Sequence, residues 1–178
     1  MSRLRLVLAV ALGAIIVVAA PAGASMEDKG RAVISRTALE RSIVAEINAI
    51  RASRGLRRLT VSRPLAQAAR RHSHDMANVG YFGHDSSNGQ DFGERVRRFY
   101  GSNGYSWRAG ENILWESPDT DPEGAVEMWL ESASHRRILL APGWREIGLS
   151  AVHAVSGRGV FGGLEMTVVT ADFGVRTR

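Results

Sequence analysis

Two histidines and one glutamate are the residues of this sequence with the clearest potential for chemistry. His84 stands in the segment VGYFGHDSS, Glu111 in the polar triplet Gly110-Glu111-Asn112, and His135 in SASHRR. Imidazole and carboxylate groups can together bind a divalent cation. The three residues belong to three separate segments, so only the folded chain could bring them together.

His84 follows the predicted end of a helix. That helix is predicted to begin near Ser62, with a proline in its first turn, and to end at Gly80. His84 then lies in a connecting segment, where functional side chains are common. Tyr81 and Phe82 are expected to anchor this segment to the core.

Glu111 is predicted at the mouth of a strand, because it lies between Trp107 and the apolar residues 113–115. A carboxylate at such a place is costly unless it is paired. Its neighbour Asn112 would belong to the same site.

His135 lies on or just after another predicted helix. Asp121 is the expected N-cap, Pro122 the first helical residue, and the helix should end before Pro142. Ser134, a weak helix former, indicates a distortion beside His135.

The remaining pattern indicates an α+β domain with helices packed on an antiparallel sheet. A first helix should begin with a capping box of Thr37 and Glu40 and end at Gly55, and a third should cover residues 92–100. Strands are expected over residues 147–155 and 160–175, joined through SGRG as a hairpin. The segment GRGVFG within that connection fits G-x-G-x-x-G, but it would open a strand rather than a helix, so we interpret it as a turn.

The other histidines have structural interpretations. His72 and His74 form an H-x-H pair, but on a helix their side chains point about 200° apart and cannot share a metal. His72 shares an apolar helix face, so we expect it to be buried and hydrogen-bonded. His74 should be exposed to solvent, and His153 should be an outward-facing polar residue of the first hairpin strand.

The chain divides into a leader and one domain. Two arginines precede an apolar run over residues 6–20, and Pro21 and the string Ala22-Gly23-Ala24 follow, as in a secretory signal peptide over residues 1–24. The alternative is a retained anchor, although the run is shorter than the roughly 20 residues of a spanning helix. Residues 25–36 are expected to be a flexible lead-in, and residues 37–178 the domain.

Composition excludes several classes of protein. The chain has no cysteine, so neither disulfides nor an N-terminal lipid-modified cysteine are available. Without residues 1–24 it would carry 21 basic residues (23 minus Arg3 and Arg5) and 18 acidic ones, a formal charge of +3. This small charge, scattered arginine pairs and predicted export argue against a nucleic-acid partner.

Several segments together resemble the bacterial branch of the CAP superfamily, which includes cysteine-rich secretory proteins, venom allergens and plant pathogenesis-related proteins. They are, in the family's order, AARRHSHDMANVGYFGHDS, GENI, MWLESASHRRILL, IGLSAV and TADFGV. The resemblance extends from about Thr37 to Val175. It implies a three-layer α-β-α sandwich, with a central antiparallel sheet flanked by helices, and a secreted or cell-envelope location.

The resemblance also implies a cavity lined by two histidines and two acids. His84 and His135 match the histidines, and Glu111 matches the glutamate of the GEN signature. Where animal relatives have the second acid, this chain has Ser132, with Glu131 one residue away. We place Asn112 and Ser132 in the same cleft, and His84, His135 and Glu111 as candidate ligands of a divalent cation such as Zn²⁺.

Two functions remain open at this point. The first is an extracellular binding module for a small hydrophobic ligand, a peptide or a cell-envelope component, with no stable membrane span after signal cleavage. The alternative is a metal-dependent hydrolase or peptidase that uses the same cleft, with His84, Glu111 and His135 as its only candidate catalytic residues. The resemblance favours binding, because lipid binding and protein partners are known for more members of the family than proteolysis, and the incomplete acid pair points the same way. The sequence also has no nucleophilic cysteine and neither a G-x-S-x-G nor an H-E-x-x-H motif.

Overall fold

The computed structural model describes residues 33–101, 104 and 106–177. The predicted signal peptide, over residues 1–24, lies outside this part of the chain. Of the predicted lead-in, Ile34–Ser35 forms a short strand instead of a flexible segment, because it pairs with the distant residues Val152 and His153. Such long-range pairing leaves no local pattern in the sequence.

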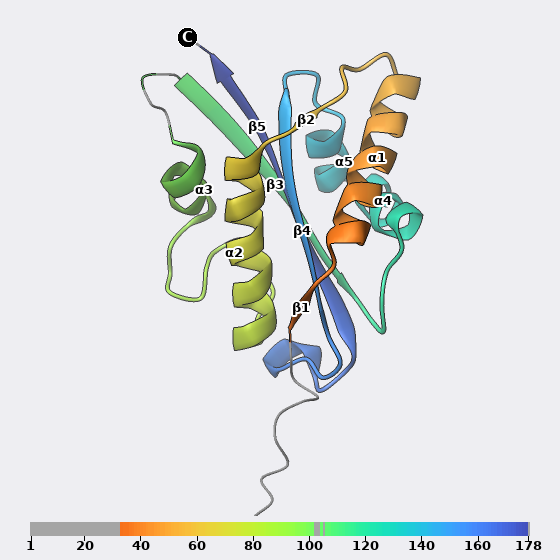
Figure 1. The fold of residues 1–178 in the computed structure, drawn as a ribbon, viewed down its shortest axis with the longest axis vertical. Coiled ribbons are helices and arrows are strands. Elements are labelled where there is room, and N and C mark those ends of the chain that lie inside the picture. The colour runs from red at the N-terminus through yellow and green to blue at the C-terminus, as the bar shows by residue number, and fades with distance from the viewer. Residues whose placement is uncertain (1–32, 102–103, 105, 178) are drawn as a thin grey trace, which may run out of the picture.

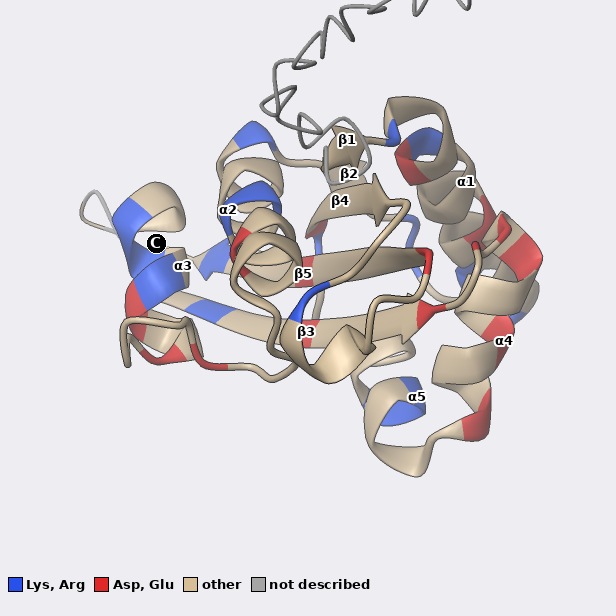
Figure 2. Ribbon diagram, turned by 90° about the horizontal axis from the view of Figure 1, so that it is seen from below, with Lys and Arg blue, Asp and Glu red and all other residues tan. Residues whose placement is uncertain are grey.

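The described residues form three layers, with a sheet between two groups of helices (Figures 1 and 2). Helices α2 and α3 cover one face of the sheet, and α1, α4 and α5 cover the other. This arrangement confirms the predicted α-β-α sandwich. In chain order the elements are β1 (Ile34–Ser35), α1 (Thr37–Ser53), β2 (Thr60–Val61), α2 (Arg63–Val79), α3 (Phe92–Tyr100), β3 (Ser106–Glu116), α4 (Pro122–Glu131), α5 (Ala133–Leu139), β4 (Glu146–Ala154), the 3₁₀ turn η1 (Gly159–Phe161) and β5 (Met166–Thr177).

The sheet has the strand order β1-β4-β5-β3, and β2 also pairs with β4. All of these pairs are antiparallel except β2–β4, which is parallel. In this order β3 has a neighbour on one side only, so its other edge is open to the loops that carry the candidate site. Within residues 33–101, 104 and 106–177, none of the helices combines the length and apolar character needed to span a bilayer.

The first helix begins where the sequence predicts, but its capping box does not form. Residue Arg36 occupies the N-cap and makes no side-chain cap bond. Glu40 instead accepts a hydrogen bond of 3.0 Å from the backbone N–H of Ala151. Ala151 lies in the stretch of β4 between the residues that pair with β2 and those that pair with β1, so its backbone N–H is left for the Glu40 carboxylate.

The predicted hairpin forms, with a longer connection than expected. The second strand starts at Met166 rather than at residue 160, and GRGVFG contains η1 instead of opening the strand. Its backbone meets the end of α2, where the Val160 N–H donates to the Gly80 carbonyl at 3.0 Å. Gly80 has a φ of 89°, and a Cβ there would lie 2.6 Å from the Arg158 carbonyl carbon, so only glycine fits.

Each face of the sheet has its own apolar core. The larger cluster packs α1, α4 and α5 against the sheet and includes Trp129 and Phe173, while Met76 and Phe161 lie in a cluster on the α2 face. Burial of each such side chain stabilises the fold by about 1.5–3 kcal/mol. These two cores hold β3 in place between them.

Candidate functional site

Glu111 lies in the middle of the 11-residue strand β3, not at its mouth as the sequence predicts. The strand is longer than expected because every residue from Ser106 to Glu116 pairs with β5. Glu111 is only 3% exposed, and it stands opposite Asp172 across the two strands. The site therefore contains a buried carboxylate that needs partners.

Both carboxylate oxygens of Glu111 have partners. Arg95, from α3, places its Nη2 2.5 Å from Oε2, and the Nδ1 of His84 lies 2.8 Å from Oε1. Arg95 itself is fully buried. A charge-assisted pair of this kind is what makes a buried carboxylate tolerable.

The loop that carries His84 is held from two sides. The Nε2 of His72, on α2, lies 2.8 Å from the Gly83 carbonyl, which can only accept, so this nitrogen carries the proton. Arg95 donates through Nη1 to the His84 carbonyl, also at 2.8 Å. His72 is buried as predicted, but it also lies 4.0 Å from Oε1 of Glu111 and so underlies the site.

The surroundings shift the pKa of three groups in this cluster. The hydrogen bond with Glu111 is the main cause that raises the pKa of His84, whose side chain is 53% exposed. Burial lowers the pKa of His72 and favours its neutral form. Burial, and then the charge of Glu111, raise the pKa of Asp172 well above its ordinary value, which favours a protonated carboxyl beside Glu111.

The next residue of β3, Asn112, points to the opposite face of the sheet. It is buried, and its Nδ2 donates to the backbone carbonyl of His135 at 3.0 Å. Burial is the main cause that lowers the pKa of His135, followed by the charge of His84. The two histidines are thus close enough to interact electrostatically around the open edge of β3.

His135 lines an apolar pocket of about 310 Å³ at this edge. The helix breaks at Ser132, two residues before the predicted distortion at Ser134, and this break separates α4 from α5. Ser132 lines the pocket, whereas Glu131 is exposed and does not. The lining residues are Phe82, Ile113, Leu114, Trp115, Met128, Trp129, Ser132 and His135.

The candidate metal ligands are divided between these two environments. His84 and Glu111 form one hydrogen-bonded pair, and His135 belongs to the neighbouring pocket. In the described part of the chain, no three His, Asp or Glu side chains are grouped closely enough to hold a metal ion. The Arg95 guanidinium on Glu111 also opposes a second cation there. Among the described residues, the three predicted ligands are therefore not brought together as one group.

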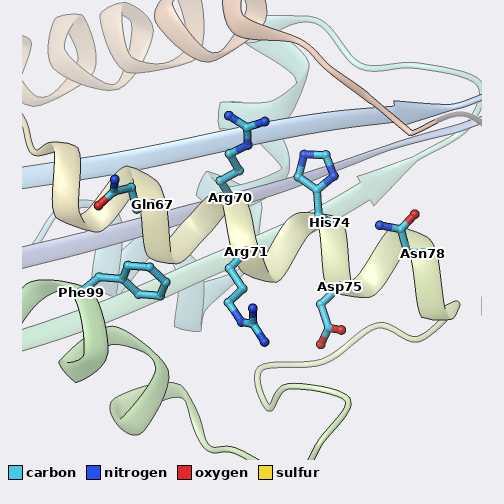
Figure 3. A pocket seen from close by; sticks show the side chains of 7 residues that line it. All are labelled: Gln67, Arg70, Arg71, His74, Asp75, Asn78 and Phe99. Atoms are coloured by element: carbon cyan, nitrogen blue, oxygen red, sulfur yellow. The ribbon is translucent and has the colours of Figure 1, made fainter.

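A larger hollow of about 650 Å³ lies along α2, away from the candidate site. In Figure 3, Arg70 and His74 leave the helix on one side, and Arg71 and Asp75 on the other. Its polar groups therefore do not converge on one ligand. His74 is half-buried rather than exposed as predicted, since its Nε2 lies 3.2 Å from the Ser35 hydroxyl in β1.

Sequence reasoning missed Arg95 and Asp172. Arg95 stands in RVRR, which has the pattern of a solvated charged helix, and Asp172 is a single acid within an apolar strand. The only available signal was that a buried Glu111 carboxylate would be costly without a positively charged partner. No signal identified which arginine would supply it.

Comparison with known proteins places this architecture in a family. Residues 44–173 match the family model described as CAP: Cysteine-rich secretory protein family. The chain is 35% identical over 124 residues to the uncharacterized protein YkwD of Bacillus subtilis, covering 68% of this chain and 46% of that protein. It is 34% identical over 114 residues to the uncharacterized membrane protein YlbC of the same organism, covering 64% and 32%. This chain thus spans less than half the length of either relative.

Solved structures show the same fold. An extracellular protein containing an SCP domain from Bacillus anthracis matches with a TM-score of 0.60 at 29% identity, over 77% of this chain and 40% of that one. An outer surface protein from Borrelia burgdorferi matches with a TM-score of 0.67 at 18% identity, over 83% and 99%, which is evidence of shared fold alone. On the match to the family model, the sequence relatives and the layered fold, the chain belongs to the cysteine-rich secretory protein (CAP) family.

Proposed function

We propose that this protein is an extracellular binding module that takes the apolar chain of a small amphiphile into the pocket beside β3. The observation that carries the proposal is the pocket itself. It is lined by two tryptophans, Trp115 and Trp129, and its rim carries Phe82 and Met128, which are each 38% exposed. Exposed apolar groups around a concave apolar surface are typical of a ligand site.

A fatty acid is the ligand class that suits both parts of the site. The volume of about 310 Å³ is at the small end of the range for ligand pockets, which suits one apolar chain. The half-exposed ring of His84, with its raised pKa, offers a positive charge to a carboxylate at the mouth. Arg95 is already paired with Glu111, so it would not compete with His84 for the carboxylate of the ligand.

The alternative of a metal-dependent hydrolase has less support. A metal bound by Glu111 would be a second cation on a carboxylate that is already paired with the Arg95 guanidinium, and it would displace the hydrogen bond between Oε1 and His84. The position of the second acid is Ser132, and the nearby Glu131 is exposed. The pocket therefore lacks the second carboxylate that such a hydrolase would use beside its histidines.

An extracellular location is part of the proposal. The Bacillus anthracis protein is described as extracellular and the Borrelia burgdorferi protein as an outer surface protein. The leader predicted over residues 1–24 would direct this chain to the same side of the membrane.

Tryptophan quenching tests the proposed ligand. A brominated medium-chain fatty acid, titrated into the protein, should quench Trp115 and Trp129 in a saturable way, because bromine would enter the pocket that they line. Met128→Glu places a charge at the rim and should weaken binding about tenfold, which corresponds to about 1.4 kcal/mol.

Val61→Glu is the matched control, since Val61 is also an exposed apolar residue but lies at a different hollow, between α1 and β2. It should leave the affinity unchanged. Equal weakening by both variants, or quenching that never saturates, would contradict the proposal.

A further inference from the structure

The exposed large apolar side chains of the described residues fall into distinct places. Phe82 and Met128 belong to the pocket beside β3, and Val61 lines a small hollow between α1 and β2. The other exposed apolar residues of the described chain line neither of these two hollows. They are Ile34, Val79, Val155, Val160 and Leu164, which we call the apolar pole.

The apolar pole occupies one end of the molecule. Ile34 is in β1, Val79 ends α2, and the other members lie in the connection between β4 and β5. Figure 1 shows these segments together at the lower end, opposite the C-terminus. Each of the five side chains is between 48% and 61% exposed. Side chains of this size gathered at one end of a molecule mark an interaction surface.

Backbone hydrogen bonds tie the segments of the pole to one another. The Val160 N–H donates to the Gly80 carbonyl at 3.0 Å, and the Gly157 N–H donates to the Leu164 carbonyl at 2.7 Å. Ile34 is in register with His153 in β4. The apolar side chains are therefore displayed from a formed surface and not from independent loops.

Few charged groups lie near the pole, and two of them are members of ion pairs. His153 lies 3.2 Å from Glu165 through its Nε2, and Arg36 lies 2.8 Å from Asp119. Arg158 adds a positive charge to the same connection. Little therefore opposes contact with an apolar layer that has a negative surface.

The position of the pole along the chain identifies its partner. The described fold begins at Val33, next to Ile34 of the pole, and the apolar run over residues 6–20 lies upstream. Residues 21–32 can span at most about 40 Å. In the alternative in which the apolar run is retained as an anchor, the membrane that holds it lies within reach of this end of the domain.

We propose that the apolar pole docks on the surface of a lipid bilayer, with Val160 and Leu164 entering the interfacial layer. One apolar segment by itself gives only weak, reversible attachment, and a second contact makes it stable. The pole would be that second contact. No member of the pole lines the ligand pocket, and different variants test the two proposals, so they can fail separately.

Site-specific labelling tests the docking directly, because the chain has no cysteine of its own. Full-length Leu164→Cys and Val160→Cys, labelled with an environment-sensitive dye, would be reconstituted into vesicles of phosphatidylcholine and phosphatidylglycerol that contain a lipid-borne quencher. Arg58→Cys is the matched control, since Arg58 is exposed in the connection at the opposite end of the molecule. Quenching at positions 160 and 164 should exceed that at position 58 by about twofold or more.

A second arm separates docking from simple tethering. Val160→Asp combined with Leu164→Asp should abolish quenching of a dye at Val155→Cys, whereas Val61→Asp should leave it intact. Circular dichroism would confirm that each variant is folded. Equal quenching at both ends would overturn the proposal. A dye response that follows protein concentration in the absence of lipid would assign the pole to a second copy of the chain and would also overturn it.

Discussion

Two adjacent residues of strand β3 face different environments on the two sides of the sheet: a charged network on one side and an apolar pocket on the other. Glu111 faces α2 and α3, where Arg95 and His84 compensate a buried charge. Asn112 faces α5, where it fixes the His135 backbone beside an apolar pocket. One side is thus a network of paired polar groups from which the half-exposed ring of His84 reaches solvent, and the other is an apolar pocket. Glu111 and Asn112 of the GEN motif therefore do not line the apolar pocket; they position the segments around it.

The first prediction would break the polar side. Arg95→Met leaves the buried Glu111 carboxylate without its cation and should lower the free energy of unfolding by about 3–5 kcal/mol, as when one partner of a buried ion pair is removed. Equilibrium urea denaturation would measure the loss.

Arg98→Met, on the exposed side of the same helix, is the control and should change stability by less than about 0.5 kcal/mol. Adding Glu111→Leu to Arg95→Met should recover much of the loss, because no unpaired charge remains. A similar small effect for both single variants would show that the pair contributes nothing to the polar side.

The second prediction concerns the support below the network. His72→Ala removes a fully buried ring and its bond to the Gly83 carbonyl, so stability should fall by about 2–3 kcal/mol. His74→Ala, two residues along α2, is half-buried and should cost clearly less. Thermal unfolding of the two variants would compare them, and an unchanged melting temperature for His72→Ala would show that the ring is not part of the core.

The third prediction tests whether Ser132 or Glu131 faces the apolar pocket. Ser132→Glu places a carboxylate in the pocket lining and should weaken fatty-acid binding about tenfold in the quenching assay, which corresponds to about 1.4 kcal/mol. Glu131→Gln, at the exposed neighbouring position, should leave binding unchanged.

The reverse result for this pair would place Glu131 in the cleft. Calorimetry with zinc provides a further check on the same variant. Zinc affinity that appears in Ser132→Glu and disappears when His84 is also replaced by alanine would favour the metal-dependent alternative.

The smallest predicted effect separates the two histidines by pH. The hydrogen bond with Glu111 raises the pKa of His84, so its contribution to stability is complete below the unfolded pKa of about 6.5 and is lost as pH rises through the folded value. Burial lowers the pKa of His135, so its contribution is present above about 6.5 and is lost as pH falls through the folded value.

Proton NMR titration of the two rings should therefore show His84 titrating above His135. In His84→Gln, the pKa of His135 should rise, because one of the two causes of its shift has been removed. Coincident titration of the two rings would contradict the division of the site into a polar and an apolar side.

Much of the scaffold could be predicted because its signals are local. The start of α4 follows from Asp121 as N-cap and Pro122 at the first position, and the end of α2 follows from Gly80, the αL residue that the helix needs there. The family motifs likewise stand in the sequence in their order. Caps, turns and periodicity act over a few residues, so a single sequence can show them.

Tertiary contacts decided what the site residues do. Glu40 accepts a hydrogen bond from the backbone of β4 and does not cap its own helix, and Arg95 is buried although RVRR has the pattern of a surface helix. Ser132, and not Glu131, faces the pocket because the helix breaks at that residue. The sequence by itself determined the family, the main helices and which residues to consider. Only the packed structure decided which buried charge meets which partner, because that choice depends on desolvation and on segments far apart in the chain.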